Sequence, residues 1–129
     1  MKLIYFFTAA AFVLSGCNLS SKSNDAKETI PGIYIRQSEG EFSKAIDTLI
    51  ISANNEEAGT YLIIRKTRFN RIVDGKLQPP EYKAEKMIAD YNEKSQQLQD
   101  MKTGRLFSFN VKTNELLFGT ETYQKIEKP

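Results

Sequence analysis

The feature that most constrains the fold is a succession of short runs rich in β-branched and aromatic residues, separated by turn-forming residues. Such side chains pack well on a pleated surface, so runs at this spacing are typical of β-meanders, sandwiches and barrels. The runs cover residues 32–36, 47–52, 59–65, 105–111, 115–118 and 123–126. Residues 66–73 either continue the third run or form the next strand. The pattern predicts an all-β domain with an antiparallel meander.

Turn residues mark the ends of several runs. Asp74-Gly75 is a strong hairpin signal, because both residue types tolerate a positive φ. Pro79-Pro80 interrupts regular structure, because proline lacks a backbone donor and restricts the residue before it. In the first run, Ile33 and Ile35 lie on one face of the expected strand.

Residues 81–101 allow two interpretations. The segment has no glycine or proline, and its apolar residues can be placed on one helical stripe. It also fits two strands, at about 83–91 and 96–101, joined by residues 92–95. We favour two strands, because residues 91–94 form a plausible turn and all neighbouring runs are β. One helix within 81–101 is the alternative.

The N-terminus has the organisation of a secretory signal peptide. Met1 and Lys2 give a basic start, residues 3–14 carry no charge, and small residues precede Cys17. As a helix, residues 3–14 would reach roughly 18 Å, whereas the hydrocarbon core of a bilayer is about 30 Å thick. We therefore expect a cleaved leader over residues 1–16 and no permanent span.

The cleavage site adds a more specific signal. Leu14-Ser15-Gly16-Cys17 resembles the lipobox of bacterial lipoproteins, and Cys17 is the only cysteine of the chain. The resemblance implies lipidation of Cys17 with diacylglycerol and palmitate-type acyl chains, and anchoring in the cell envelope. Several acyl chains hold a protein stably on a membrane. Asn18 stands where aspartate favours the inner membrane, so we expect the outer membrane, facing the periplasm.

The remaining chain divides into two parts. Polar residues rich in Ser and Asn follow the cysteine, so 17–29 is predicted to be a lipidated cysteine and flexible tether. Residues 30–129 are long enough for a single β-rich domain that needs neither a disulfide nor a metal. Acidic residues dominate 37–57 and basic residues dominate 61–86, although the net charge of the whole chain is only +2.

The first expected strand carries Gly32-x-Tyr34, and hairpins of similar length follow it. Together with the lipobox, this pattern over residues 30–126 resembles small lipocalin-like lipoproteins of the Bacteroidetes type. The resemblance implies a small antiparallel barrel. It also implies an alternative function, the carriage of a small apolar ligand in a pocket.

The composition argues against an enzyme. The chain has no histidine, and lipidation would use its only thiol, which removes the usual nucleophile–base systems and most zinc sites. No phosphate-binding glycine loop is present. Carboxylate pairs such as Glu81 with Glu85 are expected to be surface charges. We predict no catalytic residue, no cofactor and no metal.

The strongest candidate for a binding site is the basic run 65–72. Arg65, Thr67, Phe69 and Arg71 share one strand face. Basic residues interleaved with an aromatic can meet single-stranded nucleic acid, an acidic protein or anionic glycans. Export disfavours nucleic acid, so we expect a protein partner. The predicted partner-binding residues are Arg65, Arg68, Phe69 and Arg71.

Overall fold

A computed structural model describes residues 28–127 of the chain. The predicted leader, the lipidation site Cys17 and nearly all of the predicted tether lie outside the described residues. No helix within the described part is long and apolar enough to cross a membrane.

The described chain is all-β, as the sequence predicted. Nine strands follow one another: β1 (Gly32–Glu39), β2 (Ser43–Asn55), β3 (Thr60–Val73), β4 (Lys76–Leu77), β5 (Glu81–Asn92), β6 (Gln97–Asp100), β7 (Leu106–Asn110), β8 (Glu115–Phe118) and β9 (Glu121–Glu127). Residues 66–73 continue β3, and residues 81–101 form β5 and β6 around a turn at 93–96. The preferred interpretation of 81–101 is therefore confirmed, and the helical alternative is wrong.

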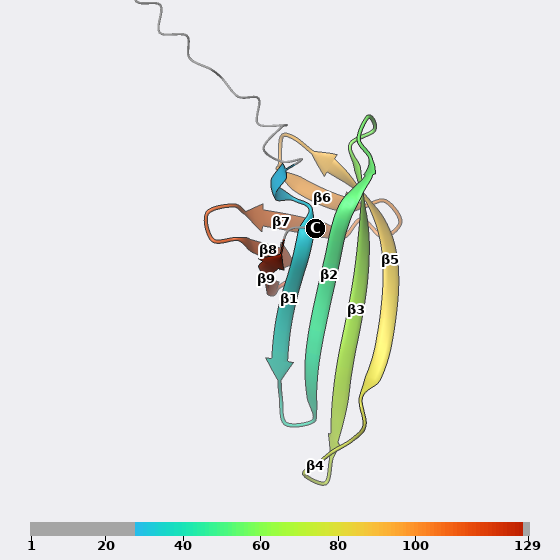
Figure 1. The fold of residues 1–129 in the computed structure, drawn as a ribbon, viewed down its shortest axis with the longest axis vertical. Helices are drawn as coiled ribbons and strands as arrows, with labels where there is room; N and C mark the ends of the chain where they lie inside the picture. The colour runs from blue at the N-terminus through green and yellow to red at the C-terminus, as the bar shows by residue number, and fades with distance from the viewer. Residues whose placement is uncertain (1–27, 128–129) are drawn as a thin grey trace, which may run out of the picture.

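Eight of the strands close into an antiparallel barrel, a small lipocalin-like architecture (Figure 1). Consecutive strands pair all the way round, and β1 closes the ring by pairing with β9. The short strand β4 is an addition that pairs only with the end of β3. Closure removes sheet edges wherever it is complete.

The barrel interior is filled by side chains from alternate positions of the strands. Leu49, Ile51, Ile63, Phe107 and Leu116 are all completely buried. The rings of Phe107 and Phe118 stack with their centroids 4.3 Å apart. Burial of such side chains stabilises the fold by roughly 1.5–3 kcal/mol each. This packed interior is the main source of stability.

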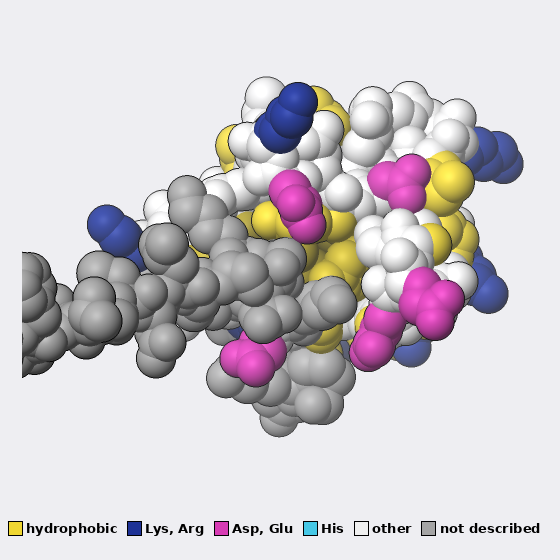
Figure 2. Space-filling view, turned by 90° about the horizontal axis from the view of Figure 1, so that it is seen from above, with side chains coloured by type: hydrophobic (Ala, Val, Ile, Leu, Met, Phe, Trp, Pro, Cys, Tyr) yellow, Lys and Arg dark blue, Asp and Glu magenta, His cyan; other side chains and the backbone are white. Residues whose placement is uncertain are grey.

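On β1, the buried side chain is Tyr34 rather than either neighbouring isoleucine. Tyr34 is 2% exposed, and its hydroxyl donates to the carbonyl oxygen of Ile30 at 2.8 Å. Ile33 and Ile35 share the opposite face, which looks outward, and both are half-buried. Ile30 is itself buried and covers the end of the barrel at which the described chain begins. In the view onto that end, acidic side chains surround a patch of hydrophobic ones (Figure 2).

The four longest strands run past the end of the others. β1 pairs with β9 only at residues 33–35, and β5 pairs with β6 only at residues 89–92. Beyond these points β1, β2, β3 and β5 continue as an open sheet, away from the end where the described chain begins (Figure 1). We call residues 36–39, 43–48, 66–77 and 81–86 the sheet extension. Its inner face continues the barrel interior, and its outer face continues the barrel exterior.

Candidate functional site

A polar cluster closes the barrel interior where the sheet extension begins. Asp47 of β2 is 4% exposed and accepts hydrogen bonds from three side chains. Arg65 donates through Nε at 3.0 Å and Nη2 at 2.7 Å, Thr67 through its hydroxyl at 3.0 Å, and Tyr123 through its hydroxyl at 2.6 Å. Because one carboxylate accepts hydrogen bonds from all three side chains, the cluster holds β2, β3 and β9 together where it closes the interior.

Protonation of this cluster is set by burial and hydrogen bonding. Burial acts to raise the pKa of Asp47, but hydrogen bonds from Arg65 and Tyr123 outweigh it, so the pKa lies below its usual value. Burial, together with the bond to Asp47, raises the pKa of Tyr123. Asp47 is therefore a carboxylate at neutral pH. A general acid needs the opposite shift.

A second arginine lines the same end of the barrel. Arg105 pairs with Glu85 at 2.5 Å and lies 3.5 Å from Asp100, which is buried. The guanidinium groups of Arg65 and Arg105 each lie 5.4 Å from the centre of the Phe118 ring. Arg65 and Arg105 therefore each have a carboxylate and an aromatic partner.

The inner face of the sheet extension carries an aromatic residue between two cations. Arg71 and Lys83 lie 5.9 Å and 5.5 Å from the ring centre of Phe69. Arg71 also pairs with Glu81 at 2.8 Å. The arginine charges of the inner face are thus balanced by carboxylates within the domain.

The outer face of the sheet extension combines isoleucine side chains with exposed positive charges that no carboxylate of the described chain balances. Strand register places its side chains in rows across β1, β2, β3 and β5. The rows are Ile33–Ile50–Ile64–Lys86, Ile35–Thr48–Lys66–Ala84 and Gln37–Ile46–Arg68–Tyr82. Lys66, Arg68 and Lys86 are exposed, and none of them forms an ion pair with a carboxylate of residues 28–127.

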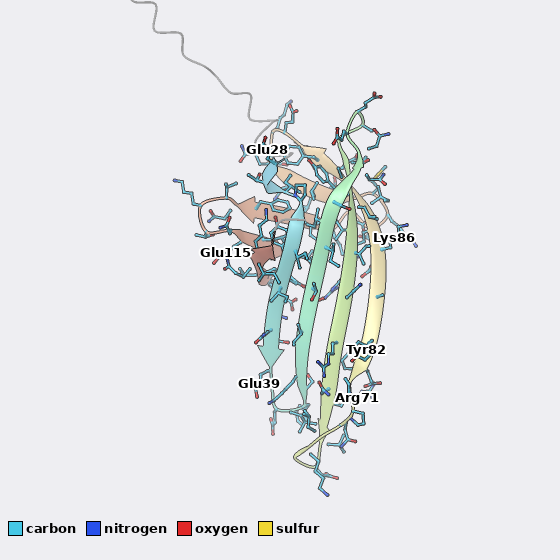
Figure 3. The ribbon with its side chains drawn as sticks, viewed as in Figure 1. Glu28, Glu39, Arg71, Tyr82, Lys86 and Glu115 are labelled. Atoms are coloured by element: carbon cyan, nitrogen blue, oxygen red, sulfur yellow. The ribbon has the colours of Figure 1, made fainter. Side chains whose placement is uncertain are left out.

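Shallow hollows and exposed apolar side chains are both present at the sheet-extension end of the molecule. One hollow of about 490 Å³ is lined by Ile46, Lys66, Arg68 and Tyr82, among others. Tyr82 is 72% exposed, and Figure 3 shows it on β5 near the far end of the sheet. Phe42, Val73 and Leu77, in the two hairpins of that end, are also exposed. An apolar surface of this kind marks an interaction site more often than an ordinary surface does.

The four predicted partner-binding residues are divided between the two faces. Arg65 belongs to the closure of the barrel, with Asp47 as its partner. Phe69 and Arg71 lie together on the inner face. Arg68 lies on the outer face, between Ile46 and Tyr82. The basic run therefore contributes to two surfaces, and only Arg68 is unpaired and exposed.

The outer face was missed at the level of sequence, although a signal for it exists. Leu49-Ile50-Ile51 and Tyr61-Leu62-Ile63-Ile64 are apolar without alternation. A strand with one face in water normally alternates, whereas continuous apolar runs are typical of strands covered on both faces. In the barrel, Ile51 and Ile63 are buried inside, while Ile50 and Ile64 are half-buried outside.

Within the described residues, no three metal-binding side chains gather into a cluster. Comparison of the chain with protein-family models, with curated proteins and with solved structures finds no match.

Proposed function

We propose that this chain is a lipid-anchored envelope protein whose barrel binds a protein partner through the outer face of the sheet extension. The observation that carries the proposal is the combination of outward-facing isoleucines with three exposed cations that have no carboxylate partner in the described chain. The proposed membrane anchor is Cys17, in the outer membrane facing the periplasm. The role is non-catalytic and needs no cofactor.

Charge favours a partner with acidic residues around an apolar patch. Lys66, Arg68 and Lys86 stand around the small side chain of Ala84, at neighbouring positions of β3 and β5. Complementary charge speeds encounter and sets register, while apolar contact supplies most of the affinity. Tyr82 adds an exposed aromatic of the kind that is enriched at energetically dominant interface positions.

The barrel fold is also compatible with the alternative, the carriage of a small apolar ligand. The barrel interior argues against a ligand pocket, because the fully buried side chains of Tyr34, Tyr123 and Phe107 fill it. This favours protein binding over the alternative. The hydroxyls of both tyrosines already have partners inside the protein. An apolar ligand would have to displace these side chains.

The test compares two charge reversals on opposite faces of one strand. Arg68→Glu places a negative charge on the outer face, and we expect it to weaken retention of the partner from envelope extracts of the source bacterium at least tenfold. Arg71→Glu changes the same residue type on the inner face and should retain the same polypeptide as the unaltered protein. The readout is quantitative mass spectrometry of that polypeptide. Equal retention by both variants, with both folded, would remove the outer face from consideration.

A further inference from the structure

One strand of the sheet extension has a free edge. β5 pairs with β3 along residues 81–90 on one side, but with β6 only along residues 89–92 on the other. The loop after β6 covers one more position, because the Met101 amide donates to the Ile88 carbonyl at 2.9 Å. Within the described chain, no strand pairs with the outward side of residues 81–86. Figure 1 shows this half of β5 running along the border of the sheet.

The direction of the backbone groups follows from that hydrogen bond. The Ile88 carbonyl points away from β3, while the Tyr91 amide points toward the β3 side and donates to Gly59 at 3.1 Å. Backbone groups alternate sides along a strand. The amides and carbonyls of Tyr82, Ala84 and Lys86 therefore point outward at the free edge.

We propose that an extended acidic segment of the partner protein adds to the barrel as a strand on this edge of β5. This inference rests on the proposed function and specifies how the partner is held. Main-chain hydrogen bonds to a sheet edge supply affinity in this mode, and side chains beside the edge select the sequence. The edge of β5 offers free backbone groups for these hydrogen bonds and charged side chains beside them.

Side chains beside the edge specify an acidic occupant. A strand added at the usual spacing of about 4.8 Å would place one outward side chain beside Ala84, with Lys66 on the next strand behind it. Tyr82 and Lys86 flank that position on β5, and Figure 3 labels both along the strand. A carboxylate there meets Lys66 and Lys86, and Ala84 leaves room for it.

A second copy of this chain fits the edge less well. In an antiparallel pair centred on Ala84, residue 88 of the partner copy would lie opposite Pro80. The Met101 segment of the second copy, which covers Ile88 of that copy, would then overlap Pro79-Pro80 of the first copy. A single extended segment carries no such neighbouring strand. Free edges are normally protected against self-association, and the alternating charges of Glu81, Lys83 and Glu85 serve that purpose.

The test uses a nine-residue synthetic peptide that alternates glutamate with valine, added to the full chain carrying Cys17→Ser. We expect binding, with slower solvent exchange of the amides of Tyr82, Ala84 and Lys86 in nuclear magnetic resonance spectra. A peptide alternating lysine with valine should not bind. Absence of the protection at these three amides would overturn the proposal.

A backbone variant separates edge pairing from attraction to the face. Ala84→Pro removes an amide that points to solvent, so the β3–β5 pairing stays intact while the edge loses a donor and gains a ring. We expect at least a tenfold loss of peptide binding, with an unchanged unfolding midpoint of the barrel taken as proof of folding. Ala84→Ser is the matched control, because it keeps the amide and adds only one small atom to the side chain, and it should retain most of the peptide binding.

The outcomes distinguish this inference from the proposed function. If Ala84→Pro binds the acidic peptide normally while Lys66→Glu and Arg68→Glu do not, the outer face binds partners without strand addition and the edge proposal is wrong. If Lys66→Glu, Arg68→Glu and Ala84→Pro all bind the peptide like the unaltered protein, both proposals lose their support.

Discussion

At the scale of the residue, Asp47 is the most consequential polar side chain of the barrel. It holds Arg65, Thr67 and Tyr123 together and is nearly inaccessible to solvent. Asp47→Asn keeps the shape and removes the charge. Hydrogen bonds to a charged group are worth about 1.5–3 kcal/mol, and removing one partner of a buried pair is costly. We expect the free energy of unfolding at pH 7, measured by urea denaturation, to fall by about 2–3 kcal/mol.

The pH dependence of the same variant follows from the lowered pKa of Asp47. An unfolded aspartate has a pKa of about 3.9, so the stabilisation by Asp47 is fully present above that pH. It is lost as the pH falls through the lower pKa of the folded state. The difference between the unaltered protein and Asp47→Asn should therefore shrink below about pH 4. A constant difference down to pH 2, with exposed Glu57→Gln as the control, would contradict this account.

At the scale of the element, adjacent isoleucines of β3 should behave differently. Ile63 is fully buried inside the barrel, whereas Ile64 is half-buried on the outer face. Ile63→Ala removes packed methyl groups and leaves a cavity, so we expect a loss of about 3 kcal/mol in the free energy of unfolding. Ile64→Ala should cost about 1 kcal/mol or less. Equal losses in urea denaturation would show that the outer face is packed against part of the chain.

The strands were predictable from the sequence where local signals exist. The turn after Asn92 and the hairpin at Asp74-Gly75 lie close to their expected positions, because turn chemistry acts over a few residues. The direction of side chains was not predictable in the same way. Ile63 and Ile64 are equally apolar, so only pairing with β2 and β5 decides which of them is inside.

The candidate site was predictable only in part, since its geometry depends on contacts between distant residues. Arg68 is exposed on the outer face, as a binding residue should be. Arg65 is not free, because it pairs with Asp47, which lies 18 positions away on another strand. Asp47 also accepts a hydrogen bond from Tyr123, which lies 76 positions from Asp47 in the sequence. Local patterns carry no information about such pairs. The free edge of β5 likewise arises from unequal strand lengths around a closed ring.

At the scale of the whole molecule, the two ends of the barrel suit different roles. The described chain begins near Ile30, at the end of the barrel that this residue covers, and the sheet extension points the opposite way (Figure 1). Residues 17–27 could reach at most about 40 Å when fully extended. A barrel held through Cys17 would therefore have its Ile30 end within about 40 Å of the bilayer, with the outer face of the sheet extension and the β5 edge toward the other end of the molecule.

The proposed lipid anchor is tested by Cys17→Ser. Serine cannot accept the thioether-linked lipid, so we expect the variant in the soluble fraction after membranes are sedimented, while Ser20→Ala, outside the lipobox, stays in the pellet. Because Cys17 and the β5 edge are separate parts of the molecule, the released protein should still bind the alternating glutamate–valine peptide. Retention of Cys17→Ser in the pellet, even after washing with high salt to remove electrostatic attachment, would show that the chain is held on the membrane by something other than lipid on this cysteine.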